Sequence, residues 1–222
     1  MSQARAVQSN GKGHNGSGTM AAGAVVRAIA PAPATIAELS AACVKFVRAA
    51  VGIELDYEPE TLPILDHYLE EGRKAARARP ETAALVAHAA GAYFGEVVRR
   101  QHASWWRIEG DDPSMYRIEL KDVFLSFCPV QLMADALLRA DADDDKESEG
   151  EGEAMIERIE VGEEDRQAVE ERLAELPSVS EREFYAPSTR LEVIDIAVDA
   201  IRARRMAEGD AGDAELSPED YE

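Results

Sequence analysis

Glu96 is the residue of this sequence whose surroundings most favour chemistry. It follows Gly95 in a largely apolar stretch, and Arg99 and Arg100 come about one helical turn later. A carboxylate in a cleft opened by Gly91 and Gly95 would serve as a base or as a recognition group. The other interpretation is a surface ion pair of Glu96 with Arg100, worth about 0.2–0.5 kcal/mol. The sequence leaves both interpretations open.

Trp105 and Trp106 form the second candidate site, because paired indoles can stack on a ligand or anchor a partner. Successive residues of a strand point to opposite faces. We therefore expect one indole in the core, while the other is a candidate for an interface.

Metal and nucleophile chemistry have weaker support. The histidines outside the first 34 residues are His67, His88 and His102, and none forms an HExxH or similar pair with a nearby acid. The sequence therefore predicts no metal site and no cofactor. Cys128 follows Ser126 at an expected strand-to-helix junction, but G-x-S-x-G is absent. We interpret Cys128 as a buried structural thiol.

The stretch from Glu81 to Ile108 reads as a helix that runs into a strand. One side of this helix is apolar and the other side is polar. The apolar side carries Ala83, Val86, Ala90, Tyr93, Phe94 and Val97, and the polar side carries His88, Glu96, Arg99 and Arg100. We expect one buried face, in which Gly91 and Gly95 form a packing groove for a flanking helix led by Leu191.

The sheet is expected to follow this helix directly. Residues 105–109 and 115–127 have strand composition and flank a turn at residues 110–114. Apolar residues alternate with polar ones up to Leu120 and occupy even-numbered positions. From Val123 onward they occupy odd-numbered positions. The switch requires a bulge or turn near Lys121 and Asp122.

Further helices with apolar faces are predicted on both sides of this unit, for example from Ser188 to Met206. The fold class is therefore α+β, with about six helices packed around a small antiparallel sheet of two or three strands. We expect one domain over residues 34–207, with an acidic disordered insertion at 141–153. Residues 1–33 are predicted to be a disordered Gly/Ala/Pro-rich arm, and residues 208–222 an acidic disordered tail.

The charge is distributed unevenly along the chain. The formal net charge is -20 over 222 residues; residues 35–140 hold 12 basic and 16 acidic residues, whereas residues 141–222 hold 9 and 28. A chain without a basic stripe lacks the attraction that drives nucleic-acid binding. A basic protein partner fits better. We expect no membrane span, since no stretch approaches about 20 apolar residues.

Two short motifs resemble a family of uncharacterised bacterial domains. They are LDYEPETLPILD at residues 55–66 and GAYFGEVVRR at residues 91–100, and the tryptophans at 105 and 106 follow them. The resemblance covers residues 36–140 and implies a shared fold in a bacterial, cytoplasmic setting. It implies no catalytic residue and no known function.

These observations favour a non-enzymatic interaction protein, an adaptor or an immunity-like inhibitor, that binds a protein partner through an acidic surface. The expected binding residues are Glu96, Arg99, Arg100, Trp105 and Trp106. The alternative is a hydrolase-like enzyme with a site around Glu96, to which His67 and Tyr93 would contribute. Homo-oligomerisation also stays open.

Overall fold

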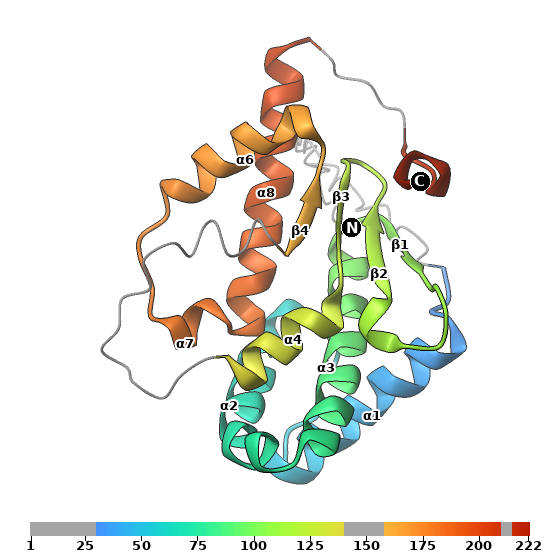
Figure 1. Ribbon diagram of the computed structural model, residues 1–222, viewed down its shortest axis with the longest axis vertical. Helices are drawn as coiled ribbons and strands as arrows, with labels where there is room; N and C mark the ends of the chain where they lie inside the picture. The colour runs from blue at the N-terminus through green and yellow to red at the C-terminus, as the bar shows by residue number, and fades with distance from the viewer. Residues whose placement is uncertain (1–29, 140–157, 210–214) are drawn as a thin grey trace, which may run out of the picture.

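The computed structural model describes residues 30–139, 158–209 and 215–222. Within these ranges the chain forms seven α-helices and one antiparallel sheet of four strands (Figure 1), which confirms the predicted α+β class. The helices are α1 (Ala34–Val51), α2 (Leu62–Ala78), α3 (Pro80–Gln101), α4 (Pro129–Leu138), α6 (Glu163–Ala174), α7 (Glu181–Phe184) and α8 (Pro187–Ala207). The strands are β1 (Ser104–Arg107), β2 (Arg117–Leu120), β3 (Leu125–Phe127) and β4 (Ile159–Val161).

Helix α3 is the centre of the fold. Pro80 occupies its first turn, where a missing N–H costs nothing. Helix α1 packs on one side of α3 and α4 packs on another. Every residue from Ala89 to Arg99 is buried as a result. The prediction of a single buried face is therefore wrong for this half of the helix, because neighbours cover its whole circumference.

The strands lie in the order β1-β2-β3-β4, and each pairs with the next in antiparallel fashion. Strand β2 ends at Leu120 and β3 begins at Leu125, so the chain turns where the apolar parity switches. The predicted turn near Lys121 and Asp122 is thus confirmed. The sheet has one strand more than predicted, because Ile159–Val161 pairs with β3. A three-residue strand that far along the chain carries too little pattern to be recognised.

Helices α6, α7 and α8 complete the other half of the fold. In Figure 1, α3 and α8 stand upright on either side of α4. Helix α6 packs on α8, and α8 also contacts α2 and α4. Buried apolar residues from all four strands and from the described helices join one hydrophobic cluster. Among the described helices, none is long and apolar enough to cross a membrane.

The end of the described chain differs from its prediction. Residues 215–222 do not form an unfolded tail: Pro218–Tyr221 form a 3₁₀ helix, labelled η3, and Tyr221 is buried. Ser217 and Asp220 form a capping box that stabilises this turn. The predicted insertion at residues 141–153 lies outside the described residues, as does the predicted arm up to residue 29.

The two glycines of α3 do mark a close approach, but not to the expected helix. A Cβ atom on Gly91 would lie 2.5 Å from Val130 Cα, and one on Gly95 would lie 2.3 Å from the Trp106 ring. The prediction of a groove for α8 is therefore wrong. Helix α4 fills the first position and the Trp106 indole of β1 fills the second.

This packing predicts the effect of alanine at three helical glycines. Gly91→Ala should lower the free energy of unfolding by about 3 kcal/mol, since the new methyl meets backbone that cannot yield. Gly72→Ala is the control: its Cβ would lie 3.7 Å from Leu137 Cδ1, an ordinary contact, so higher helix propensity should add up to about 1 kcal/mol. Gly95→Ala should be destabilising by about 2 kcal/mol. Urea unfolding measures all three, and equal effects would contradict the packing.

Candidate functional site

The inner site joins Glu96 of α3 to Trp106 of β1. Glu96 Oε1 accepts hydrogen bonds from Arg99 Nη1 at 2.7 Å and from the Trp106 indole N–H at 2.8 Å. Arg99 Nη2 donates to the carbonyl of Ala30 at 2.9 Å. All three side chains are buried. The Glu96 carboxylate is therefore bound by groups within the fold. The space at Gly91 and Gly95, where a cleft was expected, is filled by α4 and by Trp106.

Arg100 points away from this cluster and covers Tyr57. Its guanidinium carbon lies 4.1 Å from the centre of the Tyr57 ring, and its Nη1 donates to the Glu96 carbonyl. The predicted side-chain pair of Glu96 with Arg100 is thus wrong, because Arg99 takes the carboxylate. Arg100 itself is exposed, as the surface interpretation requires.

The loop between α1 and α2 brings the first sequence motif onto the second. Tyr57 has φ 68°, a left-handed conformation that few residues other than glycine adopt. Its N–H donates to the Tyr93 hydroxyl at 2.9 Å, and the two rings stack at 4.8 Å. Thr61 lies 3.1 Å from the same hydroxyl. The strained backbone at Tyr57 is held in place by Tyr93 of α3.

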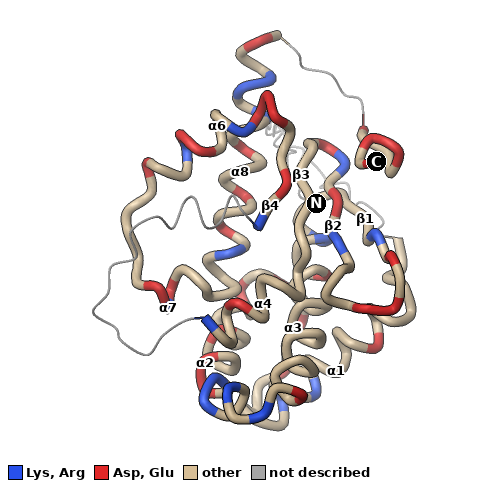
Figure 2. The backbone as a smooth tube through the Cα atoms, in the orientation of Figure 1, with Lys and Arg blue, Asp and Glu red and all other residues tan. Residues whose placement is uncertain are grey.

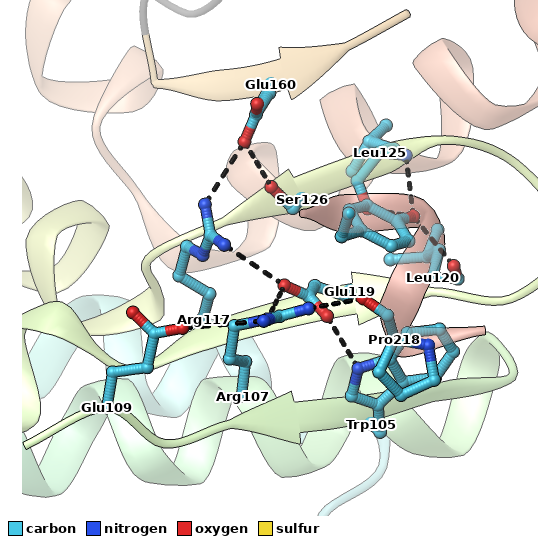
Figure 3. Close-up of polar contacts among 11 residues, drawn as sticks. Trp105, Arg107, Glu109, Arg117, Glu119, Leu120, Leu125, Ser126, Glu160 and Pro218 are labelled. Atoms are coloured by element: carbon cyan, nitrogen blue, oxygen red, sulfur yellow. Dashed lines mark hydrogen bonds and ion pairs between the residues drawn. The ribbon is translucent and has the colours of Figure 1, made fainter. Parts of the chain in front are cut away.

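The outer face of the sheet holds a second buried carboxylate (Figure 3). Glu119 of β2 is fully buried and accepts hydrogen bonds from Trp105 Nε1 at 2.6 Å, Arg107 Nε at 2.5 Å and Arg117 Nη2 at 3.2 Å. Arg117 also reaches Glu160 of β4 at 3.3 Å. The hydrogen bond to Glu119 raises the pKa of Arg107 above its ordinary value. We call Trp105, Arg107, Arg117 and Glu119 the outer cluster.

Residues 215–222 lie over the outer cluster. The Tyr221 ring stacks on Phe124 at 4.4 Å and meets the Trp105 ring edge-on at 5.7 Å. Its hydroxyl lies in the β2–β3 turn, where it contacts the Leu120 carbonyl at 2.7 Å and accepts from Leu125 N–H at 3.0 Å. Burial raises the pKa of the Tyr221 phenol well above its ordinary value.

The five residues predicted to bind therefore lie in three different places. Glu96, Arg99 and Trp106 meet in the inner site, Arg100 lies on Tyr57, and Trp105 belongs to the outer cluster. The expectation that the two indoles face opposite sides is confirmed. His67 is exposed on α2, Tyr93 binds Tyr57, and Glu96 binds Arg99. The structure does not bring these three together as the hydrolase hypothesis requires.

The sequence did not reveal the parts played by Glu119, Arg107 and Tyr221. Glu119 alternates with apolar residues and so reads as solvent-facing; only its register opposite Trp105 makes it a partner of the indole. Tyr221 lies in an acidic stretch of sequence that was predicted to be a disordered tail. The spacing of Ser217 and Asp220 was the available signal, since it matches a capping box.

A cavity of about 330 Å³ lies between α2, α4 and α7. Ser188 donates its N–H and its hydroxyl to Asp66 on the cavity wall, at 3.0 and 2.5 Å. Burial raises the pKa of Asp66, and the bonds from Ser188 act in the opposite direction. Arg73 donates to the Ala136 carbonyl at 3.0 Å. These contacts join α2 to α8 and to α4.

Neither cysteine has the surroundings of a nucleophile. Burial raises the pKa of the Cys43 thiol to about 12, and burial also raises the pKa of Cys128. A raised pKa keeps a thiol protonated and unreactive at neutral pH. No group of three or more potential metal ligands occurs in the part of the chain that the structure describes.

A comparison with protein-family models, curated proteins and solved structures finds no match to the chain. The family resemblance of the LDYEPETLPILD and GAYFGEVVRR motifs therefore stays a prediction.

The inner site predicts a large cost for Glu96→Gln. The substitution removes the charge that compensates buried Arg99, so the free energy of unfolding should fall by about 3 kcal/mol. Glu81→Gln on the exposed first turn of α3 is the matched control and should change it by less than about 0.5 kcal/mol. Chemical denaturation followed by tryptophan fluorescence measures both. Similar values for the two variants would contradict the buried pair.

The buried phenols predict how stability depends on alkaline pH. Burial raises the pKa of Tyr93 to about 12, and that of Tyr221 is raised as well, from an ordinary value of about 10. Because the folded state favours both protonated forms, their contribution to stability is complete below about pH 10 and is lost as pH rises through the folded pKa values. Phenolate absorbance should show Tyr93 and Tyr221 among the late-titrating tyrosines, together with Tyr68, whose pKa burial also raises. Tyr93→Phe and Tyr221→Phe should each remove one, and loss of neither would contradict the assignment.

Proposed function

We propose that this protein acts by binding another protein, as an adaptor or an immunity-like inhibitor, and that an acidic surface on α6 attracts a basic partner. The acidic surface consists of Glu163, Glu164, Glu170 and Glu171. All four are exposed. Residues seven positions apart in a helix lie on the same side, so the four carboxylates form one strip.

The separation of charge in the fold is the observation that carries this proposal. Figure 2 shows mainly acidic residues on α6, where Arg166 and Arg172 are the basic ones, whereas basic residues gather at the turn between α2 and α3. The basic group comprises Arg73, Lys74, Arg77 and Arg79. A molecule with opposite charges at two ends turns in the field of a charged partner before contact. Such steering raises the association rate and is weakened by salt.

The internal pairing of the other candidate residues supports the same view. Glu96, Arg99 and Glu119 are all buried and bonded within the fold. Each would have to break those bonds to reach a substrate. The carboxylates of α6 are exposed, and the contacts of Glu163 with Arg166 and of Glu171 with Gln167 lie on the surface, so recognition through α6 is the less costly mechanism.

Neutralisation of the acidic surface tests the proposal. Tagged full-length protein is used to capture partners from a lysate of the source cells at low salt, and a captured protein is then purified for kinetic measurements. The triple variant Glu163→Gln, Glu164→Gln, Glu170→Gln should slow association about three- to tenfold at low salt, and moderate salt should remove the difference.

The matched control neutralises three exposed glutamates of the loop between α1 and α2, namely Glu54, Glu58 and Glu60. It changes the net charge by the same amount but leaves α6 intact, so its association rate should stay within about twofold of the wild type. An equal loss in both variants, salt-insensitive capture, or capture of no protein at all would each count against the proposal.

A further inference from the structure

We propose that the outer face of β1, β2 and β3 is a binding site for a short acidic peptide that carries a tyrosine, and that residues 215–222 are its resident ligand. This inference uses a different face and different residues from the acidic surface of α6. The experiment that tests it is therefore independent of the test of the proposed function.

The side chains of the outer cluster hold one another in fixed positions and form a polar platform for a ligand. Glu119 fixes the indole of Trp105 and the guanidiniums of Arg107 and Arg117 through its two oxygens. Because Nε of Arg107 is bound to Glu119, Nη2 is left to donate to the Pro218 carbonyl at 2.5 Å. Figure 3 shows Arg107 lying between Glu119 and the segment at Pro218. Glu109 lies 3.4 Å from Arg107 and Glu160 lies 3.3 Å from Arg117, so carboxylates balance both guanidiniums, and the platform holds the peptide through directed hydrogen bonds rather than through net charge.

The β2–β3 turn supplies a receptor for one tyrosine. Its main-chain groups at Leu120, Val123 and Leu125 all lie within 3.2 Å of the Tyr221 hydroxyl. Phe124 lies flat against the ring, at an interplanar angle of 12°. A phenylalanine in this position would keep the stacking but would leave the Leu120 carbonyl and the Leu125 N–H without this partner. The receptor therefore selects tyrosine over phenylalanine.

Main-chain contacts fix the direction of the peptide. Leu216 N–H donates to the Lys121 carbonyl at 2.7 Å, five residues before the tyrosine. Lys121 Nζ also lies 4.0 Å from the Glu215 carboxylate. Between these points the capping box of Ser217 and Asp220 closes the 3₁₀ turn. The site thus binds the main chain at Leu216 and Pro218, the Glu215 carboxylate, and the ring and hydroxyl of Tyr221.

The covalent link explains why a separate peptide must compete with the segment. Residues 210–214 join Gly209 to Glu215, and a link of this length gives the segment an effective concentration of about millimolar. A peptide in solution binds well only after the segment is displaced or weakened. The wild-type chain is therefore expected to bind such a peptide poorly, and a variant with a released segment to bind it well.

The test uses a fluorescent peptide with the sequence of residues 215–222 and the full-length chain. Tyr221→Ala in the protein removes the ring that holds the segment. Fluorescence anisotropy should show at least tenfold tighter binding of the peptide to this variant than to wild type. The same peptide with its tyrosine replaced by alanine should lose at least tenfold in affinity, and with phenylalanine the loss should be smaller.

Two further variants separate the binding site from a general effect on folding. Phe124→Ala, added to Tyr221→Ala, removes the surface on which the tyrosine stacks and should weaken peptide binding about tenfold. If Tyr221→Ala does not fold, Asp220→Asn breaks the capping box from an exposed position and should release the segment in its place. Equal peptide binding by wild type and by the released variants, or binding that ignores the peptide's tyrosine, overturns the proposal.

Discussion

The fold depends on one buried contact, in which the Trp106 indole enters the space above Gly95 and donates its N–H to Glu96. A buried carboxylate persists only where it is paired, and Arg99 supplies the opposite charge. Arg99 in turn binds the carbonyl of Ala30 ahead of α1. The contacts among Gly95, Trp106, Glu96 and Arg99 thus connect the sheet to the central helix and to the segment before α1.

Strand β1 carries the same arrangement on both of its faces. Trp106 donates to Glu96 on the helix side, and Trp105 donates to Glu119 on the outer side. Each carboxylate is also bound by arginine: Arg99 inside, Arg107 and Arg117 outside. A four-residue strand at the edge of a sheet gains little from its ladder alone. The two indole–carboxylate bonds hold it in register and fix which face each tryptophan presents.

Local patterns allowed much of the fold to be predicted from the sequence. The alternation of apolar and polar residues located β2, and the switch of the apolar residues from even to odd positions located the turn before β3. Because Trp105 and Trp106 are adjacent in a strand, they were expected on opposite faces. Each of these depends on neighbours within a few residues. The start of α3, predicted at Glu81 and found at Pro80, was located for the same reason.

What the sequence could not reveal depends on contacts between distant segments. The polar side of α3 reads as exposed by period alone, but Trp106 of β1 binds Glu96 and the segment before α1 binds Arg99, so both residues are buried. Glu119 looks like a surface residue until Tyr221 and its segment cover it. The division of the two tryptophans between faces was therefore predicted, whereas the partners of Glu96 and Glu119 required the tertiary structure, and the binding role of these residues stays a prediction.

Tyr221 enters the β2–β3 turn 96 residues after Leu125 has been made. A ribosome adds about 5–20 residues per second, so the turn waits on the order of 5–20 seconds for its cap. During that interval the chain does not yet contain the ring that covers Phe124 and binds the main-chain groups of the turn. Closure of the outer face by residues 215–222 is therefore among the last contacts that synthesis permits.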